Sequence, residues 1–252
     1  MVLNISNRNL TVIENGIYYF ELSDYPRIKD YEMHNIITFI NYERLHGRKT
    51  DIICDDENII EAVNNATAHP DKYTLPHPKD AFIYHGTNID AAQKILSCNR
   101  LLSATRVYGK TGEALAHERR NSLWNDPADY FEYIMFCWGD NPTGDYVVLS
   151  DNFPNAEDLE QGNFNPGVRF YFRLGDIMQH HGHIFDGYHA VKVKNEIILA
   201  DYLHSCIVPE QYKHELINRI PEELTTRVHY LSQESLGISD WNDKVYNLVC
   251  TL

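Results

Sequence analysis

The residues that first suggest chemistry are His85, Gly86 and Thr87, which end the apolar run FIYHGT. Glycine has no Cβ, so a ligand can approach its backbone closely, and its N–H and C=O can pair with a planar amide. Asn88 follows at the N-cap position of a helix predicted over 88–97. The pattern predicts a rigid floor for a ligand. A tight strand-to-helix turn with a surface histidine is the alternative.

Two adjacent arginines, Arg119 and Arg120, come shortly before an aromatic strand predicted over 130–138. Adjacent residues of a helix point about 100° apart, so one of the two faces any given cleft. The planar guanidinium matches two phosphate oxygens, which makes these arginines candidates for a phosphate clamp. Arg106 is a third candidate for this role. A solvated pair bound to nearby glutamates is the alternative.

A carboxylate, Glu196, begins the apolar strand predicted over 196–203. The two-residue period of a strand places Glu196 and Ile198 on one face. A preorganised carboxylate can stabilise positive charge that develops in a transition state. The alternative is a strand-edge charge that pairs with Lys194 and prevents edge-to-edge association.

The histidine-rich run QHHGHIFDGYHA, residues 179–190, raises the question of a metal site. Structural zinc sites need four tetrahedral ligands, and this run contains neither a cysteine nor an HExxH motif. We therefore expect a solvated loop and no metal.

Composition restricts the classes of partner. The chain has 252 residues and a formal net charge of −14 at pH 7. Such a chain repels the phosphate backbone, which disfavours non-specific nucleic-acid binding and favours a small molecule or a protein with a basic face. The five cysteines are dispersed without a CxxC pair, which argues against disulfides and zinc clusters. With no signal-peptide pattern and no apolar run of membrane-spanning length, we expect a protein that folds in the reducing cytosol and does not enter membranes.

The first part of the chain is predicted to be a small α/β segment. Its expected elements are a hairpin over 10–22 around Asn15-Gly16, a helix over 29–46, a strand over 51–54 and a helix over 56–67. The proline-rich stretch 68–80 then predicts a boundary, which separates an accessory segment, 1–75, from a second domain, 81–252.

The second part is predicted to be an α+β domain with a mostly antiparallel, sandwich-like sheet. Few helices separate its strands, so it lacks the alternation of a parallel doubly wound sheet. The expected strands cover 82–85, 130–138, 145–149, 168–173, 189–193 and 196–203. The expected helices cover 88–97, about 111–122, and a helical tail over 209–250.

The order of three motifs resembles the ADP-ribosyltransferase superfamily. FIYHGTN resembles the first-strand motif of its His-type branch, although Gly86 is closer to the polymerase-like members. DYFEYIMFCW after the arginine pair, and EIILADYLHSCIVPEQY near the end, are similar to the DarT-like toxins. The resemblance covers about residues 81–215 and implies a split antiparallel β-sandwich with flanking helices, with NAD as co-substrate.

The resemblance also implies roles for individual residues. The NAD carboxamide would pair with the Gly86 backbone next to Thr87, and His85 would hold the adenosine ribose. Glu196 would accept a hydrogen bond from the nicotinamide ribose. Arg120, or Arg119, would bind the pyrophosphate, and Tyr133 and Phe136 would contact NAD. For the residue that stacks on nicotinamide, Tyr133, Tyr146 and Tyr171 compete.

The predicted function is NAD-dependent mono-ADP-ribosylation of a side chain of a target protein by a bacterial toxin or effector. Relatives implied by the resemblance modify host proteins, including ubiquitin, which implies delivery into a host cell without a classical signal peptide. One alternative is DarT-like ADP-ribosylation of DNA or RNA bases. A second, from another class, is a non-catalytic nucleotide-binding or interaction module.

Overall fold

The computed structural model of the chain divides into two compact units. The described residues are 1–7, 11–14, 16–73, 75–118, 127–149 and 155–252. The predicted boundary divided the chain into 1–75 and 81–252, whereas each unit is assembled from three segments. The first unit contains 1–77, 103–133 and 184–192, and the second contains 78–102, 134–183 and 193–252.

The first unit contains a four-stranded sheet in the order β2-β3-β1-β4. The strands are β1 (Val2–Ser6), β2 (Val12–Glu14), β3 (Ile17–Glu21) and β4 (Asp51–Ile53). β1 is parallel to β3 and β4, and β2 is antiparallel to β3, which confirms the predicted hairpin. Gly16 has the positive φ that its turn requires, while Asn15 lies outside the described residues.

Two predicted helices of the first unit are confirmed. In α1 (Asp30–Leu45), Met33, Ile36 and Ile37 are buried, as their helical spacing indicated. In α2 (Glu57–Thr67), the Asp56 side chain accepts a hydrogen bond from the Asn58 N–H at 2.9 Å and caps the helix. The unit also contains η1 (Pro70–Tyr73), α4 (Ala104–Tyr108), α5 (Gly112–His117) and η2 (Ala128–Glu132).

A seven-stranded sheet has the order β13-β12-β8-β5-β7-β10-β9, so that β5 lies at its centre. β5 is antiparallel to both of its neighbours, β8 and β7, and β8 is antiparallel to β12. The strands are β5 (Phe82–Thr87), β7 (Tyr133–Trp138), β8 (Val168–Arg173), β9 (His183–Ile184), β10 (Val191–Lys194), β12 (Leu203–Pro209) and β13 (Val228–Leu231). A separate pair joins β6 (Arg100–Leu102) to β11 (Glu196–Ile198).

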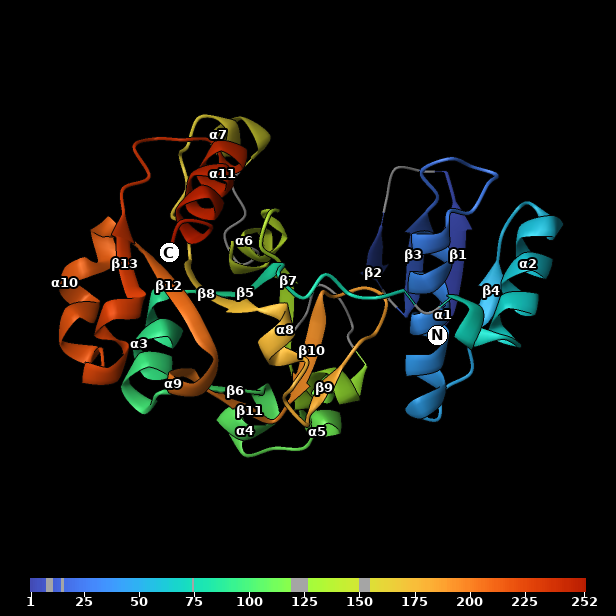
Figure 1. The fold of residues 1–252 in the computed structure, drawn as a ribbon, viewed down its shortest axis with the longest axis horizontal. Coiled ribbons are helices and arrows are strands. Elements are labelled where there is room, and N and C mark those ends of the chain that lie inside the picture. Colours follow the sequence, from blue (N-terminus) through green and yellow to red (C-terminus); the bar gives the residue numbers. More distant parts are fainter. Residues whose placement is uncertain (8–10, 15, 74, 119–126, 150–154) are drawn as a thin grey trace. The chain divides into compact units, whose positions relative to one another are not determined.

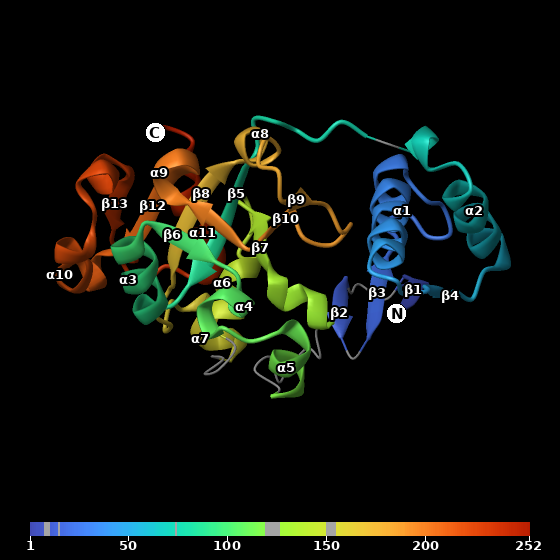
Figure 2. The same cartoon turned by 90° about the horizontal axis from the view of Figure 1, so that it is seen from below.

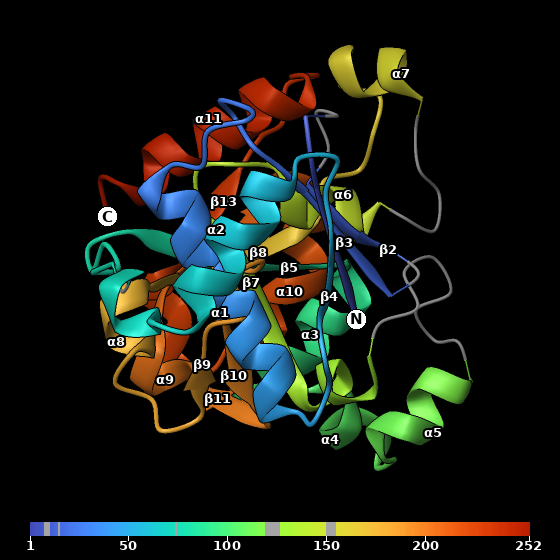
Figure 3. The same cartoon turned by 90° about the vertical axis from the view of Figure 1, so that its right-hand side faces the viewer.

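Helices cover both faces of this sheet in the second unit. α6 (Thr143–Val148), α7 (Ala156–Glu160) and α11 (Ile238–Val249) lie on one face. α3 (Ile89–Cys98) and α9 (Leu199–Tyr202) lie on the other, with the β6–β11 pair (Figures 1, 2 and 3). The remaining elements are α8 (Leu174–Ile177), η4 (Glu210–Tyr212), α10 (Lys213–Leu216), η5 (Ile217–Arg219) and η6 (Glu222–Arg227).

Three predictions for the second part are wrong in detail. The predicted strand 145–149 is the helix α6. The predicted strand 196–203 divides into β11, the short helix α9 and the first residue of β12. The predicted helical tail contains the strand β13. Short apolar runs fit a buried strand or a buried helix equally well, because periodicity cannot separate the two at that length.

The class of the fold is mixed α and β, with antiparallel pairing around β5, as predicted. One core of the second unit lies between the sheet and α11, where Trp241, Val245 and Val249 pack against Tyr84 and Tyr171. This core fixes the strand that ends in the sequence HGT.

Candidate active site

The central strand β5 loses one of its two neighbours before it ends. Its ladder with β8 continues to the pair Thr87–Val168, whereas its ladder with β7 ends at the pair Tyr84–Cys137. The Gly139 N–H donates to the Phe82 carbonyl at 2.8 Å, so the Phe82 peptide faces β7. Peptide groups alternate along a strand, and the N–H and C=O of Gly86 therefore face the side where this ladder has ended.

Exposure changes at the same point of β5. Its first residues, Phe82 to Tyr84, are buried, whereas His85, Gly86 and Thr87 are half-buried. A central strand is ordinarily covered along its whole length. The polar HGT end of β5 is therefore the half-buried part of the strand, and it lies beyond the end of the β5–β7 ladder.

The His85 side chain is held in a defined state. Its Nδ1 lies 3.1 Å from the Met135 carbonyl oxygen of β7. A carbonyl only accepts hydrogen bonds, so Nδ1 carries the proton and Nε2 is left as an acceptor. Burial lowers the pKa of His85, although the bond to Met135 acts in the opposite direction. A neutral imidazole with a free acceptor suits a ligand hydroxyl.

The structure gives a reason for glycine at position 86 that differs from the predicted one. A Cβ at this position would lie 3.2 Å from the carbonyl oxygen of Gly144 in α6. The Gly144 N–H in turn donates to the Tyr84 hydroxyl at 2.8 Å. The absent side chain therefore makes room for α6, not for a ligand.

Glu196 is the first residue of β11, which pairs with β6. Its Oε2 lies 2.8 Å from Nη1 of Arg100, with the two side chains 34% and 47% exposed. The predicted alternative gave Lys194 as partner, and the structure shows the ion pair with Arg100. Within the described residues, no hydrogen bond or ion pair joins Glu196 to His85.

The other predicted site residues are dispersed. Arg119 and Arg120 lie outside the described residues, and Arg106 is exposed on α4 of the first unit. Tyr133 also belongs to the first unit, where its hydroxyl lies 3.2 Å from His46 Nε2.

The aromatic candidates of the second unit differ in exposure. Phe136 packs against Phe172 and is fully buried, as is Tyr171. Neither ring has a surface free for a ligand. Tyr146, on α6, is 38% exposed. Exposure therefore leaves Tyr146 as the accessible ring of the second unit among the three competing tyrosines.

A buried ion pair that was not predicted from the sequence lies directly behind Gly86. Arg169 on β8 and Asp145 on α6 have no exposed side-chain surface, and both guanidinium nitrogens Nε and Nη2 donate to the Asp145 carboxylate. Arg169 Nη1 also donates to Tyr171 Oη and Asn242 Oδ1, both at 2.9 Å. The available signal was an arginine inside the apolar strand VRFYF.

The histidine-rich run does not form a metal centre in the part of the chain that the structure describes. The His180 ring stacks on His181 with centroids 4.6 Å apart. His189 Nδ1 lies 2.8 Å from the Asp186 carboxylate, which is buried. These contacts account for three of the histidines, and because His180 and Asp186 are buried the prediction of a solvated loop is wrong.

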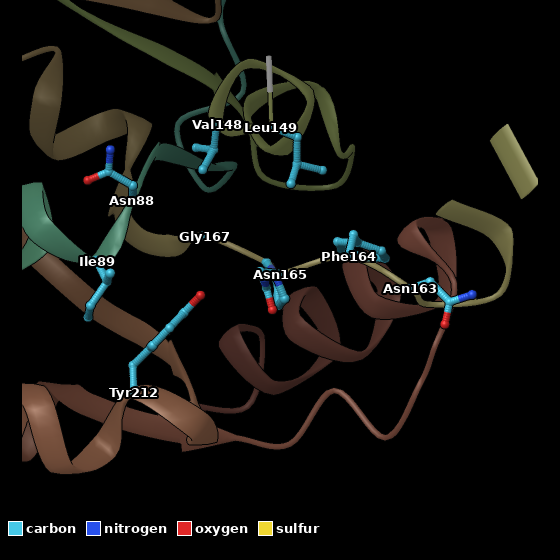
Figure 4. Close-up of a pocket in the computed structure, with 10 residues that line it drawn as sticks. Asn88, Ile89, Val148, Leu149, Asn163, Phe164, Asn165, Gly167 and Tyr212 are labelled. Carbon is cyan, nitrogen blue, oxygen red and sulfur yellow. The ribbon is translucent and has the colours of Figure 1, made fainter. Parts of the chain in front are cut away.

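A separate pocket of about 360 Å³ begins one residue beyond Thr87 (Figure 4). Figure 4 shows the Tyr212 side chain pointing from below toward Gly167 and Asn165. The lining contains no charged side chain and is formed by Asn88, Ile89, Val148, Leu149, Asn163, Phe164, Asn165, Pro166, Gly167 and Tyr212.

Comparison with known proteins gave no match to any family model, curated protein or solved structure. Within the described residues, none of the helices combines the length and apolar character that crossing a bilayer requires. The function is therefore inferred from the geometry around β5 and from the sequence motifs.

Proposed function

We propose that the second unit is an NAD-dependent mono-ADP-ribosyltransferase that modifies a side chain of a target protein, as a bacterial toxin or effector. The observation that carries the proposal is the end of the β5–β7 ladder at Tyr84, beyond which the peptide edge of Gly86 faces the side of β7 without a ladder pair. An open peptide edge has one donor and one acceptor in a plane, and a carboxamide matches it.

We assign a role in NAD binding or catalysis to each residue of the motifs. The carboxamide of nicotinamide pairs with the Gly86 peptide, and His85 Nε2 accepts a hydrogen bond from a ribose hydroxyl. Glu196 accepts a hydrogen bond from the 2′-hydroxyl of the nicotinamide ribose. For the pyrophosphate we keep the sequence-based candidates Arg119 and Arg120, which lie outside the described residues, because arginine binds paired phosphate oxygens.

The reaction breaks the bond between C1′ of the ribose and the nicotinamide nitrogen, and the bonding electrons leave with nicotinamide. A nucleophilic side chain of the target then bonds to C1′ and loses its proton. Positive charge develops on the ribose in between, and the Glu196 carboxylate stabilises it. A preorganised group of this kind contributes about 3–4 kcal/mol to lowering a barrier.

A protein acceptor is favoured over nucleic acid by charge. The chain has a net charge of −14, which opposes tracking of a phosphate backbone. A target with a basic face is attracted by the same charge.

A non-catalytic nucleotide-binding module is the second candidate function. It is favoured by one observation, the ion pair of Glu196 with Arg100, which already occupies one carboxylate oxygen. This module would bind NAD at the same peptide edge and release no nicotinamide.

Transfer of labelled ADP-ribose tests the proposal. The purified chain is incubated with NAD labelled in its ADP-ribose part and a whole-cell lysate, and label is read separately in protein and nucleic acid. We expect discrete labelled protein bands that disappear with Glu196→Ala. Label in nucleic acid alone would overturn the protein acceptor, and equal labelling by Glu196→Ala would remove Glu196 from the mechanism.

A further inference from the structure

The buried pair Arg169–Asp145 lies on the same face of the sheet as the missing side chain of Gly86. Arg169 is the register partner of Gly86 across β5 and β8, and residues directly opposite each other share a face. Asp145 follows Gly144, whose carbonyl approaches Gly86. The ion pair therefore joins the strand beside Gly86 to the helix that covers Gly86.

Additional contacts join the same three elements, which are β5, β8 and α6. The Tyr84 ring lies under the Arg169 guanidinium, with 4.8 Å between the guanidinium carbon and the ring centroid. The Tyr84 hydroxyl accepts from the Gly144 N–H and donates to the Asn141 carbonyl oxygen at 3.2 Å. The Asn242 side chain of α11 accepts a hydrogen bond from Arg169 Nη1. β5, β8 and α6 are thus held by one hydrogen-bonded network.

Stability alone does not explain a fully buried ion pair. Removing two charges from water is costly, and well-packed apolar replacements of such pairs are often neutral or stabilising. Buried polar networks instead specify one arrangement of the groups around them. Here Gly144 and Tyr84, which lie nearest to the position of a Cβ on Gly86, are bound to each other within the same set of contacts.

We propose that Arg169 and Asp145 are positioning residues for NAD binding, which hold α6 against β5 and thereby fix the orientation of the Gly86 peptide edge. The inference rests on the proposed function. It assigns no contact with NAD to either residue. Their effect is transmitted through Gly144 and Tyr84.

The test replaces both partners at once, because a single replacement leaves a buried charge unpaired and unfolds the chain. The full-length double variant Arg169→Met/Asp145→Leu is compared with wild type by thermal unfolding and by NAD turnover. We expect a folded protein whose kcat/KM for NAD falls at least tenfold, mainly through a higher KM. A folded double variant with wild-type kcat/KM and KM overturns the inference.

If the double variant does not fold, the single variant Tyr84→Phe tests the positioning role instead. It removes the hydroxyl that binds Gly144 and leaves the apolar ring in place. The matched control is Tyr230→Phe, because the buried Tyr230 hydroxyl has no hydrogen-bond partner in the described structure. We expect KM for NAD to rise severalfold in Tyr84→Phe alone. Equal KM values in the two variants contradict the inference.

A readout that does not depend on turnover separates this inference from the proposed function. Amide hydrogen exchange is measured over 82–90 and, as an internal reference, over β12. We expect faster exchange in 82–90 for Tyr84→Phe and unchanged exchange in β12. Absence of turnover in the wild type, together with this exchange result, would reject the transferase and retain the positioning role. Unchanged exchange in 82–90 would reject the positioning role itself.

Discussion

At the scale of single residues, His85 shows how the environment selects a chemical form. The bond to Met135 assigns the ring proton, and burial lowers the pKa, so the ring is neutral near pH 7. A neutral ring has an acceptor nitrogen for the ribose hydroxyl of the proposed site. The same shift has a consequence for stability.

Because the pKa of His85 is lower in the folded state, the unfolded state binds the proton more tightly. Stability is complete above the unfolded value of about 6.5 and falls as the pH decreases through the folded value. We expect His85→Gln to flatten the decline of the melting temperature between pH 6.5 and 5. The measurement is thermal unfolding of both proteins at several pH values. Parallel declines would show that His85 is not shielded from protonation.

A buried ion pair lies in the first unit. The side chains of Lys192 and Asp186 are fully buried, and Lys192 Nζ lies 2.7 Å from the Asp186 carboxylate. Burial alone would raise the pKa of Asp186, but the charges of Lys192 and His189 lower it well below its usual range. This contribution to stability is present above the unfolded pKa of about 3.9 and is lost as the pH falls further.

We expect Lys192→Met to destabilise the protein by about 3 kcal/mol, because it removes the ammonium that pairs with the buried Asp186 carboxylate and leaves the His189 ring as its remaining side-chain partner. The double variant Lys192→Met/Asp186→Leu should recover much of that loss. Denaturant unfolding measures both. A single variant as stable as wild type would show that the pair contributes little.

At the scale of elements, the sequence predicted those with strong local signals. α1 and α2 have apolar residues at helical spacing, and β5 and β8 are continuous apolar runs between turn signals. α6 was missed because DYVVL is too short to show a period. In the structure Pro142 precedes its first turn, as expected for a helix start.

The residues of the candidate site also divide into those that the sequence indicated and those that it did not. His85, Gly86 and Glu196 stood out because their types and order form a motif in the sequence. The pair Arg169–Asp145 did not, because it depends on the register of β8 against β5 and on the docking of α6. Such long-range contacts have no local signal.

The cap of α3 gives a prediction at this scale. The Asn88 side chain accepts from the Ala91 N–H at 2.9 Å, one residue after the HGT strand end. We expect Asn88→Ala to cost about 1 kcal/mol, which corresponds to a decrease in melting temperature of about 2–4 °C. Asn88→Asp keeps the cap and should melt like wild type. Identical melting of all three proteins would show that the cap is not needed.

At the scale of the whole molecule, residues 1–77 are part of a unit built from three segments. The Tyr42 hydroxyl of α1 donates to Asp129 at 2.6 Å, and Lys192 donates to the same hydroxyl at 3.3 Å. Arg48 pairs with Glu43 and Asp129. Segments far apart in the sequence therefore complete one network inside the first unit.

We expect a truncated chain, 78–252, to fail to fold, because Asp129 and Lys192 lose partners to which they are bound in the intact chain. Circular dichroism and thermal unfolding of the truncated protein measure this. A cooperative transition would instead identify 1–77 as a separable docking domain.

The measurement that tests the central claim most directly is nicotinamide release from NAD by the purified full-length chain. Wild type is compared with Glu196→Gln and with the matched control Glu215→Gln, an exposed glutamate of α10. We predict turnover by wild type and the control, and a loss of about 10²–10³-fold in Glu196→Gln. No nicotinamide from any of the three, at concentrations where NAD binds, would contradict the transferase and leave a nucleotide-binding module.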